Sequence, residues 1–156
     1  MTESTHRQKA QAERKVEVTW EGHLGDGSGT IVKGTSGQIR NLPVSWAART
    51  EHAHGKTSPE ELLAAAHASC YAMQLSHEVE AVGGAPGSYQ ISANVGFDPR
   101  VGGGFEVSFS HLDVRGSVPG LDQADFQKAV DAAAKNCPIS AALAGNVEIT
   151  VHASLN

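Results

Sequence analysis

TSPEELLAAAHASCYAM, residues 57–73, is the stretch of this sequence that decides its fold. Ser58 is a favourable N-cap, Pro59 suits the first helical position, and Glu61 completes a Ser-x-x-Glu capping box. The helix that begins here is predicted to run to about Val82, where a Gly-Gly pair ends it. A helix of about 24 residues is about 36 Å long, so we expect it to be the central element of the fold.

Alternating and turn-bounded segments predict strands on both sides of this helix. Three strands are expected before it, at residues 16–22, 30–34 and 38–45. After it we expect a hairpin of residues 89–97 and 105–118, helices at 122–136 and 138–144, and a last strand at 147–154. This order predicts an α+β fold, with antiparallel sheets around the long central helix, and not a doubly wound parallel sheet.

Length and composition bound the class of protein. The chain has 156 residues, of which 40% are hydrophobic, which suits a single domain over residues 16–156 behind a flexible polar tail of residues 1–15. A net charge of −5 argues against a nucleic-acid partner. No apolar stretch approaches the roughly 20 residues that span a membrane, and the N-terminus lacks the apolar region of a secretory signal, so a cytoplasmic location is expected.

The chain holds two cysteines, Cys70 and Cys137. Cys70 falls inside the Ala-rich central helix, where burial alone would raise its pKa and leave it inert unless a cation lies nearby. Cys137 directly precedes Pro138, so it can occupy the N-cap region of a helix, where the dipole favours a thiolate. Each cysteine alone could be a small buried hydrophobic residue. In a reducing compartment the pair favours a catalytic or metal-binding role, and a pairwise redox role is the first hypothesis.

Two motifs carry a resemblance to a known family. The helix of residues 57–73 together with NCPIS at residues 136–140 resembles the OsmC/Ohr family of thiol-dependent hydroperoxide reductases, in particular its OsmC branch. That family pairs a Pro-Glu-x-Leu-x-x-Ala-Ala-x-x-x-Cys helix with a Cys-Pro-x-Ser junction. The resemblance covers nearly the whole chain, from about Val16 to Leu155, and implies the same fold.

The resemblance implies roles for four residues. By their motifs, Cys70 matches the peroxidatic cysteine and Cys137 the resolving cysteine. Glu60 matches the active-site glutamate of the family. Arg49, in the segment ahead of the helix, matches the arginine of the OsmC branch, with Arg40 as a competing candidate because the arginine of the Ohr branch comes from an earlier loop.

Helix geometry bears on how these residues could share a site. Glu60 and Cys70 are ten residues apart on one helix, hence about 15 Å apart along its axis, so they cannot touch within one straight helix. If both belong to one active site, two long helices can pack antiparallel across a two-fold axis, so that Glu60 and Arg49 of one subunit approach Cys70 of the other. We therefore expect an intertwined homodimer with shared sites, as the resemblance also implies.

The resemblance further implies reduction of organic hydroperoxides to alcohols through a sulfenic acid and an intramolecular disulfide. No cofactor is expected, and an external dithiol, similar to dihydrolipoamide or another lipoyl reductant, would restore the thiols. We expect an apolar pocket of Leu62, Leu63, Tyr71, Met73 and partner residues to favour organic over hydrogen peroxide.

Two other hypotheses about the function stay open. The chain could be a non-enzymatic stress dimer of the same fold that binds a small apolar ligand, with its thiols merely buried. It could also bind zinc or another thiol-seeking metal through Cys70, His67 and Cys137, since His67 and Cys70 are three residues apart on one helix face.

Overall fold

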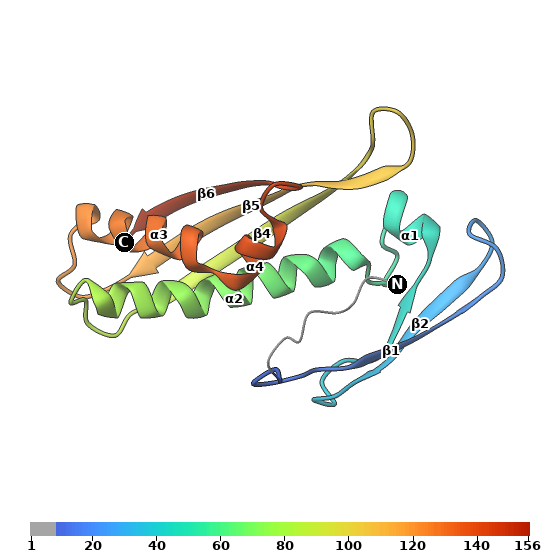
Figure 1. The fold of residues 1–156 in the computed structure, drawn as a ribbon, viewed down its shortest axis with the longest axis horizontal. Helices are drawn as coiled ribbons and strands as arrows, with labels where there is room; N and C mark the ends of the chain where they lie inside the picture. Colours follow the sequence, from blue (N-terminus) through green and yellow to red (C-terminus); the bar gives the residue numbers. More distant parts are fainter. Residues whose placement is uncertain (1–8) are drawn as a thin grey trace. The chain divides into compact units, whose positions relative to one another are not determined.

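The computed structural model describes residues 9–156, which fall into two compact units (Figure 1). The N-terminal unit ends at Ser58 and the C-terminal unit runs from Pro59 to Asn156. Of the predicted tail, residues 1–8 lie outside the described residues, while residues 9–15 are exposed and form neither helix nor strand. The single domain of residues 16–156 stays a prediction, and each unit is described by itself.

The N-terminal unit is a three-stranded antiparallel sheet in the order β1-β2-β3, followed by a short helix. Its elements are β1 (Val16–Glu21), β2 (Ser28–Gly34), β3 (Arg40–Val44) and α1 (Trp46–Thr50). Helix α1 was not predicted, and it begins where the third strand was expected to end. Ser45 explains the change of structure, because its side chain accepts a hydrogen bond from the Ala48 N–H at 3.1 Å and caps the helix.

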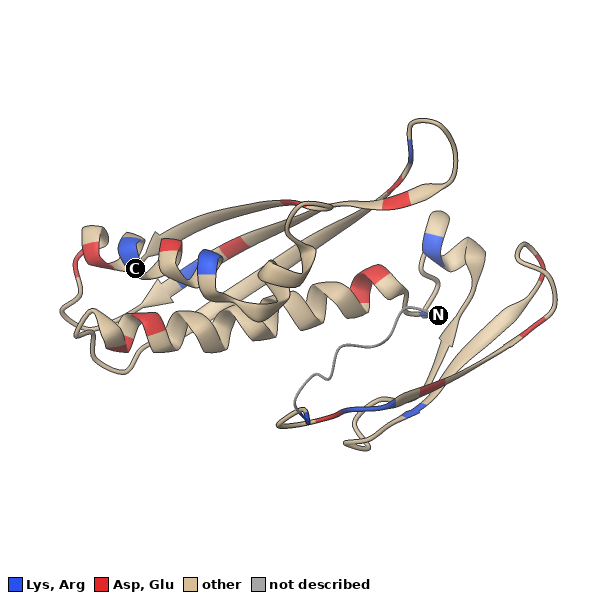
Figure 2. Ribbon diagram, in the orientation of Figure 1, with Lys and Arg blue, Asp and Glu red and all other residues tan. Residues whose placement is uncertain are grey.

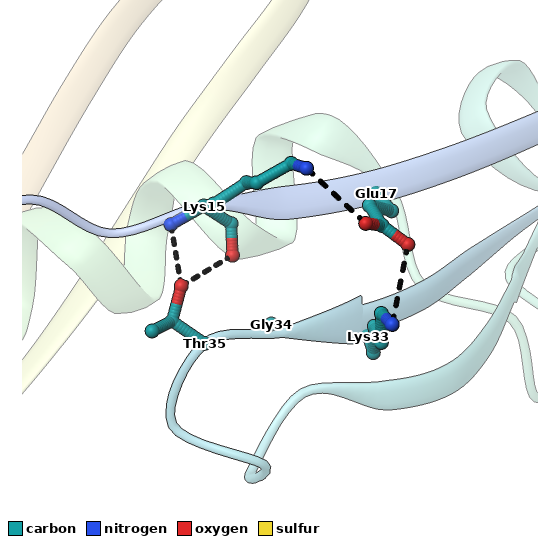
Figure 3. Close-up of a pocket in the computed structure, with 5 residues that line it drawn as sticks. All are labelled: Lys15, Glu17, Lys33, Gly34 and Thr35. Carbon is teal, nitrogen blue, oxygen red and sulfur yellow. Dashed lines mark hydrogen bonds and ion pairs between the residues drawn. The ribbon is translucent and has the colours of Figure 1, made fainter.

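A shallow hollow at the end of this sheet is lined by exposed charged residues (Figure 3). The Glu17 carboxylate lies 3.3 Å from the Lys15 ammonium and 3.6 Å from that of Lys33. The Thr35 hydroxyl joins the same strands, because it accepts from the Lys15 N–H and donates to the Lys15 carbonyl. Exposed ion pairs of this kind contribute at most about 1 kcal/mol each, so the cluster is best explained as support for strand pairing.

The C-terminal unit packs two helices against a second sheet and a third, short helix on those two (Figure 1). Its elements are α2 (Pro59–Ala81), β4 (Ser88–Pro99), β5 (Phe105–Ser117), α3 (Gln123–Asn136), α4 (Pro138–Leu143) and β6 (Glu148–Leu155). The sheet order is β4-β5-β6, with β4 and β5 antiparallel as the predicted hairpin requires. The α+β class and the long central helix are thereby confirmed.

The last strand departs from the expected antiparallel pattern, because β6 runs parallel to β5. A parallel neighbour requires a long crossover connection, and α3 and α4 supply it between the two strands. This crossover brings the α3–α4 junction back over α2, which packs against both helices. The position of Cys137 depends on that return.

Helix α2 buries one stripe of side chains at a spacing of four residues. His67, Tyr71, Leu75 and Val79 are each at most 1% exposed. The last three share the hydrophobic core with Phe126 and its neighbours on α3. The helix ends as predicted at a Gly-Gly pair: Gly83 has φ +82°, and the N–H of the following Gly84 bonds the Val79 carbonyl at 2.9 Å. The capping box of Ser58 and Glu61 at the other end stays a prediction.

Candidate active site

Cys70 lies in the middle of α2, beside the buried stripe, and its side chain is half-buried against the core. The adjacent Tyr71 fixes the rotation of the helix, since it is fully buried and its hydroxyl donates to the Val130 carbonyl on α3 at 2.8 Å. The stretch of α2 between Glu61 and Glu78 carries no Lys, Arg, Asp or Glu (Figure 2). A charged partner for Cys70 must therefore come from another segment.

Cys137 occupies the junction between α3 and α4. Its N–H ends α3 by bonding the Ala133 carbonyl at 2.9 Å, and its side chain is the N-cap of α4, with Pro138 in the first helical turn. The Cys137 sulfur accepts a hydrogen bond from the Ser140 N–H at 3.5 Å, and the residue is fully buried. The local sequence Cys-Pro-x-Ser thus holds the thiol against free helix N–H groups.

The structure brings the two sulfurs together across 67 residues of sequence. Cys137 Sγ lies 3.3 Å from Cys70 Sγ, a hydrogen-bonding contact between two free thiols. A disulfide bond is about 2.05 Å long. Only a small adjustment therefore separates the two thiols from a covalent bond.

The two thiols differ in their electrostatics. Burial is the main cause that raises the pKa of Cys70, the nearby Cys137 raises it further, and a hydrogen bond from the Ile139 backbone opposes the rise. Burial also raises the pKa of Cys137, but hydrogen bonds from the backbone and side chain of Ser140, with smaller ones from Cys70 and Ile139, bring its pKa below the ordinary value of a thiol.

The predicted glutamate belongs to the C-terminal unit, and both candidate arginines belong to the N-terminal unit. Glu60 lies in the first turn of α2 and is only 8% exposed, where its charge also suits the helix dipole. Arg49 lies in the last turn of α1, and Arg40 begins β3 as an exposed residue paired with Lys33 across the sheet. The roles of Glu60 and Arg49 stay predictions.

His67 has surroundings that the sequence reasoning missed. It is fully buried, with Nδ1 2.6 Å from the Ser110 hydroxyl and Nε2 2.7 Å from the Ser140 hydroxyl. Within residues 9–156, no group of three or more His, Cys, Asp or Glu side chains is arranged to hold a metal ion. The spacing of His67 from Tyr71 and Leu75 is the sequence signal that would have placed it in the core.

The predicted apolar pocket is wrong in grouping Tyr71 with Met73. Tyr71 is buried in the core under α3, whereas Met73 is 74% exposed on the other side of α2. Residues two apart on a helix point about 200° apart, so these two cannot line one pocket. Leu62 and Leu63 are half-buried and remain candidates.

Comparisons with known proteins identify the family and the fold of this chain. The sequence profile of the OsmC-like protein family matches residues 52–152. The chain is 36% identical over 138 residues to Peroxiredoxin OsmC of Escherichia coli strain K12, covering 88% of this chain and 93% of that one. The chain belongs to the OsmC-like protein family, which confirms the resemblance.

Further relatives agree with this assignment. The chain is 36% identical over 97 residues to the organic hydroperoxide resistance protein of Xanthomonas axonopodis pv. citri, covering 61% of this chain and 65% of that one. The crystal structure of the organic hydroperoxide resistance protein OhrB of Bacillus subtilis has the same fold, with a TM-score of 0.66 at 24% identity over 90% of this chain and 98% of that one. An OsmC from Legionella pneumophila matches with a TM-score of 0.66 at 23% identity, over 94% and 99% of the two chains.

Within residues 9–156, none of the helices combines the length and the apolar character that crossing a bilayer demands.

Proposed function

We propose that this protein is a cysteine-based peroxidase that reduces organic hydroperoxides to alcohols, with Cys70 as the peroxidatic and Cys137 as the resolving cysteine. The observation that carries the proposal is the 3.3 Å contact between two free thiols on a packed pair of helices. The names of the relatives, a peroxiredoxin and an organic hydroperoxide resistance protein, support a peroxidase-type role.

Exposure supports the division of roles between the cysteines. Cys137 is fully buried, whereas Cys70 is half-buried and can meet a substrate from outside the core. In the first step the Cys70 thiolate attacks one peroxide oxygen, the O–O bond breaks, and the departing alkoxide takes a proton to become an alcohol. Cys70 is left as a sulfenic acid.

The Cys70 thiolate needs a cation, because burial raises its pKa. We assign this role to Arg49, held by Glu60, with Arg40 as the weaker candidate because it is exposed on β3. A guanidinium at Cys70 would also donate hydrogen bonds to the departing alkoxide. Since α2 itself offers no cation near Cys70, the charge must be delivered by another segment.

A homodimer completes the proposal. Glu60 and Cys70 are about 15 Å apart along α2, so they can serve one site only if a second copy supplies one of them. The side of α2 away from the core carries Ala65, Ser69 and the 74% exposed Met73, a surface of small and apolar residues on which a second helix could pack.

The reaction cycle closes through a disulfide and an external dithiol. Cys137 attacks the Cys70 sulfenic acid, which forms the Cys70–Cys137 disulfide and releases water. A small dithiol of the dihydrolipoamide type then reduces that disulfide by exchange and becomes oxidised itself. We propose no cofactor, and we place the protein in the cytoplasm, where such reductants keep thiols reduced.

The two alternative functions, a metal site and a ligand-binding dimer, have less support. A metal site of Cys70, His67 and Cys137 would need His67 Nε2, which is taken by the Ser140 hydroxyl. A non-enzymatic, ligand-binding dimer gives no reason for two thiols at 3.3 Å with one pKa held low.

A steady-state assay tests the proposal. Turnover of cumene hydroperoxide and of hydrogen peroxide is compared with dihydrolipoamide as the reductant. We expect faster turnover of the organic peroxide and loss of two thiols per chain when the reductant is omitted. Absence of peroxide-dependent thiol loss in the reduced, folded protein would contradict the proposed function.

A further inference from the structure

His67 is a buried titratable residue that the proposed mechanism does not use. It lies one turn before Cys70 on α2, and both of its ring nitrogens face serine hydroxyls from other elements. Ser110 comes from β5 and Ser140 from α4, and both are at most 3% exposed. A fully buried imidazole with two fixed hydroxyl partners is an arrangement that a packed apolar core alone does not require.

Ser140 connects His67 to the resolving cysteine. Its N–H donates to Cys137 Sγ at 3.5 Å, and its side chain helps to lower the pKa of that thiol. A hydroxyl has a single proton to donate. When His67 Nε2–H donates to the Ser140 oxygen, the Ser140 proton is free to point at the sulfur, and Ser110 donates to Nδ1.

We propose that His67 is a positioning residue for disulfide formation: through its hydrogen bond to Ser140 it directs the Ser140 hydroxyl proton onto the Cys137 sulfur and so favours the thiolate of the resolving cysteine. This inference rests on the proposed function, in which Cys137 closes the disulfide.

The Cys137 thiolate acts in one step of the proposed cycle, the formation of the disulfide. The Cys137 thiolate attacks the sulfur of the Cys70 sulfenic acid, the S–S bond forms, and the S–O bond breaks. The leaving hydroxide combines with the proton that Cys137 had released, which yields water. The Cys137 sulfur is oxidised and the Cys70 sulfur is reduced, so the step needs no reagent beyond the hydroperoxide of the proposed function.

His67 acts here by donating a hydrogen bond and not by accepting the proton. Burial lowers the pKa of His67, so the imidazole is neutral and an imidazolium between α2, α4 and β5 is disfavoured. In the described C-terminal unit the titratable groups that face Cys137 are Cys70 and Tyr71, both from α2. Burial raises the pKa of Tyr71 far above neutrality, so Cys70 is the group whose titration is coupled to that of Cys137.

The test therefore uses full-length Cys70→Ser protein, in which Cys137 is the one remaining thiol. Its thiolate is titrated by ultraviolet absorbance, a readout that does not depend on peroxidase activity. We expect Ser140→Ala and His67→Leu each to raise the midpoint by about one pH unit, a tenfold change in the thiol equilibrium. His67→Gln should keep the midpoint, because its amide N–H replaces the donor. Ser76→Ala, at an exposed serine farther along the same helix, is the matched control.

An unchanged midpoint in folded Ser140→Ala protein would overturn the proposal even if His67→Leu fails to fold. Equal shifts in His67→Gln and His67→Leu would overturn the role of the hydrogen bond. With Cys70 present, Ser140→Ala should slow the closing of the disulfide, so that sulfenic acid accumulates and is trapped by dimedone. If the unsubstituted protein forms no sulfenic acid, the proposed function fails, while the titration still decides the role of His67.

Discussion

The environments of Cys70 and Cys137 differ although their sulfurs touch. Cys137 takes its stabilisation from its own segment, because the Cys-Pro-x-Ser junction aims helix N–H groups at the sulfur and brings its pKa below the ordinary value. Cys70 sits in a stretch of α2 without charged residues, and burial raises its pKa. The local chain thus favours the thiolate of Cys137, the proposed resolving cysteine, whereas in the proposed mechanism the Cys70 thiolate depends on a cation from another segment.

The largest expected effect separates the two cysteines. Cys70→Ser should reduce turnover to background, because no thiol remains that a peroxide can reach. Cys137→Ser should still consume one equivalent of peroxide per chain and stop at the Cys70 sulfenic acid. Dimedone labelling and mass spectrometry distinguish the two outcomes. Full single-turnover reduction by Cys70→Ser protein would reverse the assigned roles.

The next largest effect concerns the cation that another segment is proposed to supply to Cys70. In Cys137→Ser protein, where Cys70 is the single thiol, Arg49→Ala should raise the pKa of Cys70 by about 1–3 units, since an adjacent cation favours the thiolate. The thiolate fraction at neutral pH then falls, and peroxide reduction slows in proportion until the pH is raised. Thiolate absorbance and stopped-flow rates across pH measure both changes.

Arg40→Ala is the matched control for Arg49→Ala. A larger shift from Arg40→Ala than from Arg49→Ala would transfer the role to Arg40 and correct the assignment by resemblance to the OsmC branch.

A further experiment tests whether the cation that Cys70 needs comes from the second subunit. Cys70→Ser chains, which are expected to be inactive, and Arg49→Ala chains, which are expected to be slow at neutral pH, are co-expressed with different tags. If Arg49 serves the partner's site, the mixed dimer has one intact site, and a random mixture should recover roughly a quarter of the normal activity. No recovery in purified mixed dimers would show that each chain supplies its own arginine.

Some features of the fold and site could be predicted from the sequence because they depend on neighbouring residues. The Pro59 start and Gly83 end of α2, the Asp122 cap of α3 and the Cys137 junction each depend on a few adjacent residues. Helix α1 was missed because its five residues show no periodicity and Ser45 is its one local mark.

The missed features of the site arise from long-range packing. The parallel pairing of β6 and the contacts of His67 with serines 43 and 73 residues away come from tertiary structure, which no local pattern encodes. The sulfur contact itself could be expected only because the chain has two cysteines and two motifs that resemble one family.

A smaller effect is expected where α3 rests on the sheet. A Cβ added at Gly116 would lie 2.6 Å from the ring of Phe126, which is fully buried and cannot move aside. Gly116→Ala should lower the free energy of unfolding by about 1–3 kcal/mol, and the displaced α3 should slow disulfide formation by Cys137. Gly25→Ala, with open space around the added Cβ, is the control. Chemical denaturation measures the loss, and equal stabilities of the two variants would contradict the packing argument.

The smallest expected effect tests how firmly α2 is held beside α3. Tyr71→Phe removes the hydroxyl that donates to the Val130 carbonyl, while the ring keeps its place in the core. That carbonyl lies inside α3 and keeps its helical partner, so the free energy of unfolding should fall by only about 1 kcal/mol. Tyr89→Phe, at a half-buried tyrosine on β4, is the matched control in urea denaturation. A sulfur contact set by core packing should survive this change, so the rate of disulfide formation should stay within the experimental error of the unsubstituted protein. A marked slowing would mean that the Tyr71 hydrogen bond, and not the packing of the buried stripe, aligns Cys70 with Cys137.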